Sequence, residues 1–228
     1  CHSVQGTHHQ LAGYIGIPAS EITHWVAGIN HMSWFLQFDR KGEDLYPRLF
    51  EAMENPEIYA RDTVRFEIMK HFGYFVTEST RHMSEYVPYF RKRPELIEEF
   101  GLHRRRPEKV ARQRERFWQK EDPGESTQLH RSGEYASSII HAIETNTPYR
   151  FNGNVPNSGL ITNLMDGCCV EVPVYVDREG LHPLRVGDLP VQCAALNQSN
   201  VTVQGLAVEA GLSGDPELVM QAIALDPL

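Results

Sequence analysis

The order of strand-like and helix-like segments constrains the fold of this chain more than any other feature. Short β-like runs occupy 149–155, 168–176 and 181–186, and turns rich in Asn, Gly and Pro divide them. The tetrapeptide Asp177–Gly180 has the composition of a hairpin connection. Two more apolar runs lie within 22–38. Because no βαβ rhythm links these runs, we predict an α+β fold with an antiparallel sheet.

Helical patterns occupy most of the remaining chain. The segment from Ser3 to about Ile15 begins at a capping residue, and Gly73 is well placed to end a helix over 57–72. Further helices are expected at 134–144, 190–212 and 216–225, and the charged stretch 91–122 is expected to form a solvated helical excursion. We expect the helices at 57–72 and 190–212 to flank the sheet. The apolar face of the second should be buried, in the core or at a subunit contact, through Val191, Ala194, Ala195, Val201, Leu206 and Val208.

Composition excludes several classes of protein. The 228 residues carry 22 Lys and Arg against 30 Asp and Glu, a formal net charge of −8, which argues against a nucleic-acid partner. No apolar run approaches the roughly 18 residues of a membrane helix, so no membrane partner is expected. Four cysteines without a C-x-x-C pair favour reduced thiols and a cytoplasmic location. The chain starts with Cys and stops after a helix-like run, so we expect both ends to be domain boundaries or excisions rather than natural termini.

Familiar catalytic motifs are missing from the sequence. It contains no G-x-G-x-x-G, no G-x-x-x-x-G-K-[ST], no H-E-x-x-H and no G-x-S-x-G. A thiolate from Cys1 and an imidazole from His31 could bind a borderline divalent metal, although Cys1 could equally be a buried small hydrophobe. The histidines in apolar runs, His24 and His141, are expected to be satisfied core residues, and His8 with its neighbour His9 is expected at the surface.

A loop of amides forms the remaining candidate site. Asn152, Asn154 and Asn157 lie in one Gly- and Pro-containing stretch. Such a loop either holds a turn or lines a polar site, where paired donors and acceptors suit carbohydrate hydroxyls. The sequence leaves both roles open.

Several short motifs in the sequence together resemble those of glycoside hydrolase family four, most closely its α-galactosidase branch. The resemblance runs in order along essentially the whole chain. The matching words are Cys1-His2-Ser3-Val4-Gln5-Gly6-Thr7, Ala27-Gly28-Ile29-Asn30-His31-Met32, Gly73-Tyr74-Phe75-Val76-Thr77-Glu78-Ser79, Ser84-Glu85-Tyr86, Gly153-Asn154-Val155-Pro156-Asn157, Val170-Glu171-Val172-Pro173 and Leu189-Pro190 with Ala194-Ala195-Leu196-Asn197.

The resemblance implies half of a larger enzyme. Residues 1–228 correspond to a C-terminal substrate- and metal-binding domain, similar to that of lactate and malate dehydrogenases, whose N-terminal Rossmann domain would lie outside this chain and bind NAD. The implied reaction on an α-glycoside, with a galactoside favoured, is C3 oxidation, C2 deprotonation, elimination, water addition and re-reduction, assisted by Mn²⁺. A homo-oligomer is also implied, and the isolated chain is predicted to be inactive.

The resemblance also assigns roles to residues. Cys1 and His31 fall on metal-ligand positions, so we expect them to lie close together. His2 stands where phosphosugar members carry an aspartate, which leaves an acid role open and disfavours a phosphosugar substrate. Glu78 is the first candidate for the base and Tyr86 the second, with a purely structural Glu78–Arg81 pair as the competing interpretation.

Substrate contacts are implied for four further residues, Asn30, Arg81, Asn154 and Asn157. A second hypothesis of a different class also fits the sequence. In it the domain is a non-catalytic sugar-binding or oligomerisation module.

Overall fold

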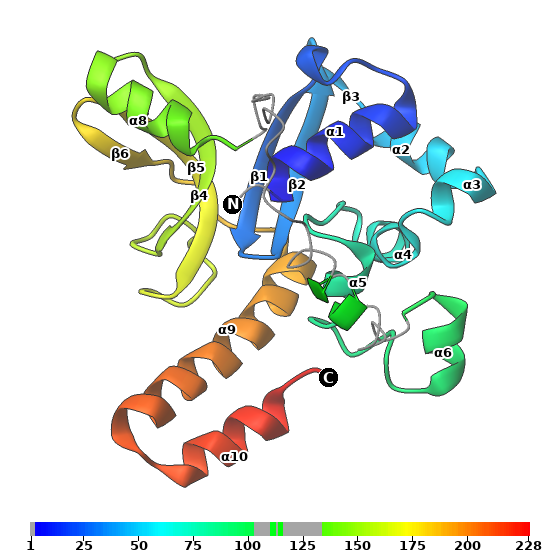
Figure 1. The fold of residues 1–228 in the computed structure, drawn as a ribbon, viewed down its shortest axis with the longest axis vertical. Helices are drawn as coiled ribbons and strands as arrows, with labels where there is room; N and C mark the ends of the chain where they lie inside the picture. Colours follow the sequence, from blue (N-terminus) through cyan, green and yellow to red (C-terminus); the bar gives the residue numbers. More distant parts are fainter. Residues whose placement is uncertain (1–2, 103–109, 113, 116–133) are drawn as a thin grey trace.

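The computed structural model describes residues 3–102, 110–112, 114–115 and 134–228. A twisted antiparallel sheet occupies the centre, and helices cover it (Figure 1). The α+β class and the antiparallel sheet flanked by helices are therefore confirmed. None of the helices in the described ranges is long and apolar enough to span a membrane.

The sheet has the strand order β3-β2-β1-β5-β4, with β6 also paired to β5. Tight turns connect β1 to β2 and β5 to β6, and Asp177 opposes Gly180 in the second hairpin as the sequence predicted. The strand bounds are β1 Thr23–Ile29, β2 Met32–Arg40, β3 Glu43–Asp44, β4 Tyr149–Pro156, β5 Cys169–Asp177 and β6 Gly180–Pro183.

The pairing of β1 with β5 is short because β5 contains a proline. Gly28 opposes Glu171, but two residues further along β5 comes Pro173, which has no N–H to donate to a ladder. The carbonyl of Val26 instead accepts a hydrogen bond from the Asn152 side chain at 2.9 Å. Beyond the proline, β5 pairs with β6, so β1 and the β4–β5–β6 part of the sheet diverge.

The helices near the N-terminus pack on the β1–β2 hairpin. α1 spans Ser3–Ile15 as predicted, and α2 spans Tyr46–Met53. The prediction of a single helix over 57–72 is wrong, because this segment contains two helices, α3, Pro56–Tyr59, and α4, Thr63–Phe72. The break lies at Asp62, whose buried carboxylate binds Arg65 and whose backbone is extended in φ. Gly73 does end α4, with a left-handed φ of 81°.

Two apolar clusters lie against the β1–β2 hairpin. One contains Val26, Phe35 and Phe38 with residues of α1 and α4. The other contains Ala27, Ile29 and Trp34 with residues of β5 and α9. Since adjacent residues of a strand point to opposite faces, the hairpin is buried on both sides. A strand with helices on both faces has little freedom to shift, which fixes the position of its turn.

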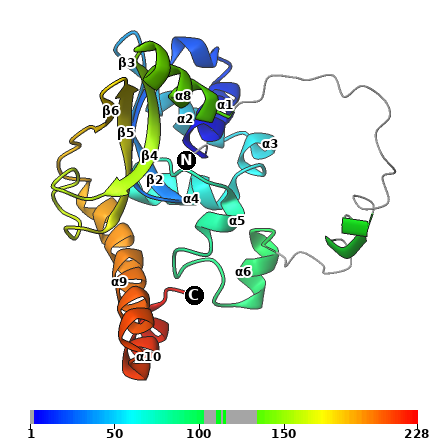
Figure 2. The same cartoon turned by 60° about the vertical axis from the view of Figure 1, so that its left-hand side comes forward.

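α9, Val191–Ser213, departs from the expected burial. Its N-terminal half is buried through Cys193, Ala194, Leu196, Asn197, Asn200 and Val201. Within the single chain, Val191 is 81% exposed and Val208 is 63% exposed, so their burial would depend on the subunit contact that the prediction allowed, whereas Ala194 and Val201 are buried. Apolar residues surround this helix evenly, so sequence periodicity could not select the buried side. Its C-terminal half projects from the sheet, and α10, Pro216–Leu225, folds back along it (Figures 1 and 2).

The remaining helices are short. They are η1 Ala19–Glu21, α5 Thr80–Met83, α6 Pro94–Glu99 and α8 Ala136–Thr145. α6 lies inside the charged stretch 91–122, of which 103–109, 113 and 116–122 lie outside the described residues, and 110–112 and 114–115 are helical. α8 begins two residues later than the sequence predicted and ends one residue later.

Replacing Gly28 by alanine is expected to destabilise the protein by about 1–3 kcal/mol. A Cβ at this position would lie 2.4 Å from the backbone oxygen of Met32 and 2.7 Å from the Cα of Ser33. These are backbone atoms of a paired strand, so they cannot move to relieve the clash. Thermal unfolding would measure the change. The matched control is Gly13→Ala in α1, where no atom lies within 4 Å and alanine should stabilise the helix. Equal stability of both variants would contradict the steric argument.

Candidate active site

His31 lies in a two-residue turn at the tip of the β1–β2 hairpin. Ile29 pairs with Met32, so Asn30 and His31 alone connect the strands. His31 has a left-handed φ of 68°, which a non-glycine residue adopts only at a cost. The turn thereby presents an imidazole whose side chain is 31% exposed.

Glu78 reaches the same place from a different part of the chain. The segment after Gly73 runs along β2, where Phe35 donates to the Phe75 carbonyl at 2.9 Å and Thr77 donates to the Ser33 carbonyl at 2.8 Å. Glu78 follows this pairing with a left-handed φ of 74°. Its Oε2 lies 3.7 Å from His31 Nε2. Two strained non-glycine residues therefore face each other, and such backbone strain concentrates at functional sites.

Tyr86 completes the surroundings of the His31 ring. Its hydroxyl lies 3.3 Å from His31 Nδ1, so a phenol and a carboxylate flank the two ring nitrogens. Burial, helped by the negative charges of Glu78 and Glu85, raises the pKa of Tyr86 above its ordinary value. A raised pKa makes this phenol a poorer base at neutral pH. The His82 ring packs edge-on to His31 at 5.3 Å between ring centres.

Glu85 lies at the centre of a cluster of charged side chains beside the site. Glu85 contacts Arg91 Nη2 at 3.2 Å, Arg81 Nε at 3.7 Å and His82 Nδ1 at 3.2 Å. Arg81 thus pairs with Glu85 rather than with Glu78, so the competing structural interpretation of Glu78 is not what the geometry shows. The Glu78 carboxylate is directed at His31.

A row of residues across four strands lies beneath the turn. Ser33, Gly28, Glu171 and Asn154 are register partners on β2, β1, β5 and β4. Glu171 is fully buried, and its Oε1 has no hydrogen-bond partner among the described residues. Its Oε2 lies 3.0 Å from Ser33 Oγ. A buried carboxylate with one unpartnered oxygen is costly when ionised.

The contacts of Ser33 favour a protonated Glu171. Ser33 Oγ lies 3.0 Å from the carbonyl oxygen of Ile29 and 3.0 Å from Glu171 Oε2. A serine hydroxyl has a single hydrogen, and a carbonyl oxygen can only accept. If Ser33 donates to Ile29, the hydrogen in the other contact must come from Glu171. Burial, together with the nearby charge of Glu78, raises the pKa of Glu171 to about 7 overall. A Ser33 hydroxyl that donated to Glu171 instead of Ile29 would act in the lowering direction.

Glu171→Gln is expected to remove one pH-dependent contribution to stability. An acid whose pKa is higher in the folded than in the unfolded chain binds more protons when folded. The parent should therefore lose stability relative to the variant as pH rises from about 4.5 to about 7, by about 3 kcal/mol in total. Chemical unfolding of the metal-free protein at pH 4.5, 6 and 8 would measure the difference. A difference that does not change with pH would show that the pKa of Glu171 is the same in the folded and the unfolded chain.

Two of the predicted site residues lie outside the described residues. These are Cys1 and His2, so the pairing of Cys1 with His31 stays a prediction. Asn30 is next to His31 in the turn, and Asn154 is exposed on β4 opposite Glu171. Glu78 and Tyr86 contact the His31 ring, and Arg81 is paired with Glu85 beside them.

Asn157 has a different position from the one that the resemblance implied. Its Nδ2 donates to the carbonyls of Ile161 and Met165, both at 3.0 Å, and its Oδ1 accepts from the amides of Leu160 and Ile161. The amide is therefore committed to its own loop and is not placed to meet a substrate. Of the two roles that the sequence left open, Asn157 fills the structural one.

Other residues gained significance only from the structure. Glu171 was part of a motif that matched the family, and nothing in its local sequence indicated that its side chain would contact Ser33 across Gly28. His24 is not a core histidine with all of its hydrogen bonds made, because its buried Nδ1 has no hydrogen-bond partner among the described residues. His8 Nε2 is also buried without such a partner. His141 is exposed rather than in the core. An apolar neighbourhood was a poor guide to the environment of these rings.

The donor set fits a divalent metal in part. His31 and Glu78 offer a nitrogen and a carboxylate oxygen 3.7 Å apart, which suit a borderline cation. In the described part of the chain, no group of three His, Cys, Asp or Glu residues is arranged to hold a metal ion. A complete shell therefore needs donors beyond the described residues, and Cys1 is the sequence candidate.

Sequence comparison identifies related enzymes. A family model described as the family 4 glycosyl hydrolase C-terminal domain matches residues 26–228. An α-galactosidase from Bacillus subtilis (strain 168) is 44% identical over 234 residues, covering the whole chain and 54% of that relative. An α-galactosidase from Rhizobium meliloti (strain 1021) is 35% identical over 246 residues, covering the whole chain and 50% of that relative. The chain thus spans about half the length of these curated relatives.

Solved structures agree with this assignment. A putative glucosidase from Bacillus subtilis superposes with a TM-score of 0.78 at 25% identity, covering the whole chain and 58% of the other. A 6-phospho-α-glucosidase from gut microorganisms, solved in complex with NAD and Mn²⁺, has the same fold with a TM-score of 0.74 at 20% identity, covering the whole chain and 56% of the other. The chain therefore belongs to glycoside hydrolase family 4 and corresponds to the C-terminal domain of that family.

Proposed function

We propose that this chain is the substrate- and metal-binding half of an NAD- and Mn²⁺-dependent α-galactosidase. The observation that carries the proposal is the meeting of His31 and Glu78, both with left-handed backbones, at the tip of the β1–β2 hairpin. Two relatives that share 44% and 35% of their aligned residues with the chain are α-galactosidases, which favours a galactoside as the substrate. A structural neighbour contains NAD and Mn²⁺, which supports the choice of cofactors.

The cofactors would be divided between the two halves of the protein. The chain has no glycine fingerprint for a dinucleotide, so NAD would be held mainly by an N-terminal Rossmann domain of the same polypeptide. Cys1 and His31 would hold Mn²⁺. When bound, the dinucleotide would supply a hydride acceptor for the sugar C3, and the metal would supply Lewis-acid polarisation of the sugar oxygens.

The side chains of this domain would move the protons. Glu78 is the base that removes the C2 proton, because its carboxylate is at the hairpin tip and is not tied to Arg81. Tyr86 is the second candidate. His2 would protonate the leaving group, since an imidazole that titrates near neutrality can act as an acid. Asn30, Arg81 and Asn154 would contact sugar hydroxyls. We further propose a cytoplasmic homo-oligomer.

Solvent isotope incorporation tests the proposed function. The full-length protein should hydrolyse an aryl α-galactoside in D₂O only when both NAD⁺ and Mn²⁺ are supplied. The product galactose should carry deuterium at C2, because the proton removed there exchanges with solvent before it is replaced. Product without C2 deuterium would exclude the elimination route. A full-length protein that binds galactosides without turnover under any cofactor condition would favour the alternative, a non-catalytic module.

A further inference from the structure

A cavity lies along β1, toward the other end of the strand from His31. It has a volume of about 480 Å³, within the range of small-molecule sites. His24, near the start of β1, is five residues from Ile29, which places the His24 end of the cavity about 15–17 Å from the hairpin tip. Asn152, which binds the Val26 carbonyl, lines the nearer end. One sugar ring bound beside Glu78 could not also reach His24.

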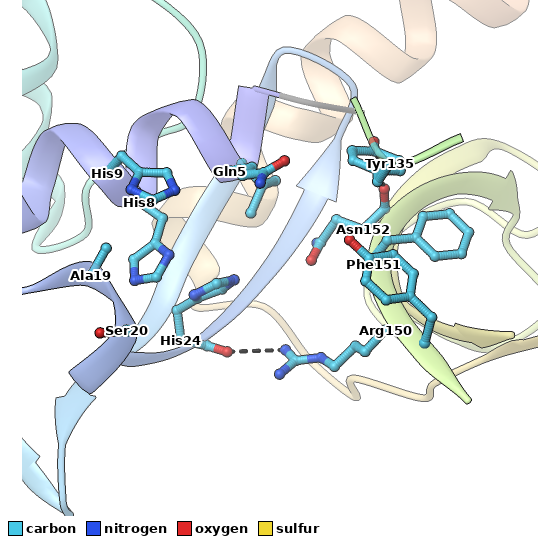
Figure 3. Close-up of a pocket in the computed structure, with 12 residues that line it drawn as sticks. Gln5, His8, His9, Ala19, Ser20, His24, Tyr135, Arg150, Phe151 and Asn152 are labelled. Carbon is cyan, nitrogen blue, oxygen red and sulfur yellow. Dashed lines mark hydrogen bonds between the residues drawn. The ribbon is translucent and has the colours of Figure 1, made fainter. Parts of the chain in front are cut away.

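The cavity exists because the sheet divides. Beyond Pro173, the edge of β1 that faces β5 has no strand partner among the described residues, and side chains from β4 fill part of the gap by binding its carbonyls. Arg150 donates to the His24 carbonyl at 3.0 Å, and Asn152 donates to that of Val26. Figure 3 shows the remaining space between side chains of α1 and β1 on one side and those of β4 and Tyr135 on the other.

Two imidazoles on one wall have unused hydrogen-bonding atoms. The rings of His8 and His24 lie 4.5 Å apart, and both line the cavity. His8 Nε2 and His24 Nδ1 are buried without a partner among the described residues. An unpartnered buried polar atom costs free energy that a ligand hydrogen bond would recover.

The charge states of the side chains that line the cavity favour a neutral ligand. Burial lowers the pKa of His24 to about 3, with the charges of His8 and Arg150 acting in the same direction, and burial also lowers the pKa of His8. Both rings are therefore neutral at pH 7. Arg150 is the only Lys, Arg, Asp or Glu among the described lining residues, and its guanidinium already binds the His24 carbonyl and lies over the Trp25 ring.

The opposite wall is aromatic. Phe151 packs against Tyr135 and stacks with Tyr149, and all three line the cavity. A neutral imidazole has one N–H and one bare nitrogen, whereas a hydroxyl can both donate and accept. A polyol therefore satisfies both rings whichever nitrogen carries the hydrogen. A sugar also has an apolar C–H face for the aromatic wall.

We propose that the cavity between α1, β1 and β4 is a separate binding site for a neutral sugar, which His8 and His24 hold by hydrogen bonds to its hydroxyls. The site does not depend on the reaction proposed for the hairpin tip. It would give the enzyme a second carbohydrate contact away from the bond that is cleaved.

Nitrogen NMR of the full-length protein, labelled with ¹⁵N-histidine, tests this site. The probes are galactose, which is neutral, and galacturonate, its anionic counterpart. Galactose should shift the His8 and His24 ring signals along a saturating curve. His24→Phe should weaken this binding about tenfold or more, read from the remaining His8 signal. The matched control, His182→Phe, removes an exposed ring paired with Asp177 on the far hairpin and should leave the curve unchanged.

Several results would overturn the proposal. They are unshifted His8 and His24 signals at saturating galactose, shifts with galacturonate alone, and an unchanged affinity in His24→Phe. If His24→Phe does not fold, Gln5→Ala, on the α1 wall, serves as the second variant and should weaken the binding of galactose. Failure of the proposed reaction gives a different pattern, because turnover could then lack C2 deuterium while the His8 and His24 signals still respond.

Discussion

Residues 1–228 alone are expected to show no glycosidase activity with any α- or β-glycoside, even with NAD⁺, Mn²⁺ and a reductant. In the proposed cycle, every proton transfer depends on prior oxidation at C3. The C2 proton of an unoxidised sugar is far too weak an acid for Glu78 or Tyr86 to remove. The chain contains no glycine-rich turn for a pyrophosphate, so it could not position NAD⁺ for that first step.

Release of a chromophore from aryl glycosides would measure this activity, with the full-length protein under identical conditions as the positive control. The full-length protein should turn over and lose its activity when NAD⁺ is removed. Robust hydrolysis by the isolated chain would mean that the redox mechanism is wrong. Glu78 and Glu85, whose segments meet at the His31 and His82 rings, would then need consideration as an ordinary acid–base pair.

Glu78→Gln in the full-length protein is expected to lower kcat by about 10²–10⁴-fold, the usual contribution of a positioned base. Glutamine keeps the size of the side chain and cannot accept the C2 proton. Tyr86→Phe should cost less, because burial and two nearby carboxylates raise the pKa of this phenol, so that less of it is in the deprotonated form that can accept a proton at neutral pH. The control Glu43→Gln changes an exposed carboxylate paired with Arg48, and should leave kcat unchanged.

Two further measurements separate a lost base from a damaged site. Thermal unfolding of Glu78→Gln should match the parent within about 1 kcal/mol, as for most substitutions of partly exposed polar residues. Exchange of the C2 proton with D₂O should fall together with kcat. If Tyr86→Phe instead causes the larger loss of exchange, the phenol is the base and Glu78 serves to orient His31.

Local sequence predicted those elements whose ends carry a chemical signal. Gly73 ended α4 because a left-handed residue was needed, and the Asp177–Gly180 turn closed its hairpin for a similar reason. The division of 57–72 was not predicted, because it depends on the burial of Asp62 with Arg65, and Arg65 also binds Thr7 of α1. That contact joins residues 58 positions apart, beyond the reach of a periodicity argument.

For the site, the sequence by itself determined which residues could take part. The order of the motifs indicated the family, and the residue types indicated that His31 could bind a metal and that Glu78 could accept a proton. Only the tertiary structure decided which of them meet. His31 and Glu78 face each other because the segment after Gly73 pairs with β2. The side-chain amide of Asn157 is not available to a substrate, because it makes its hydrogen bonds within its own loop. Glu171 and His24 acquire unpartnered atoms where β5 meets and then leaves β1. Burial and pairing between distant segments are properties of the packed chain, and no local pattern encodes them.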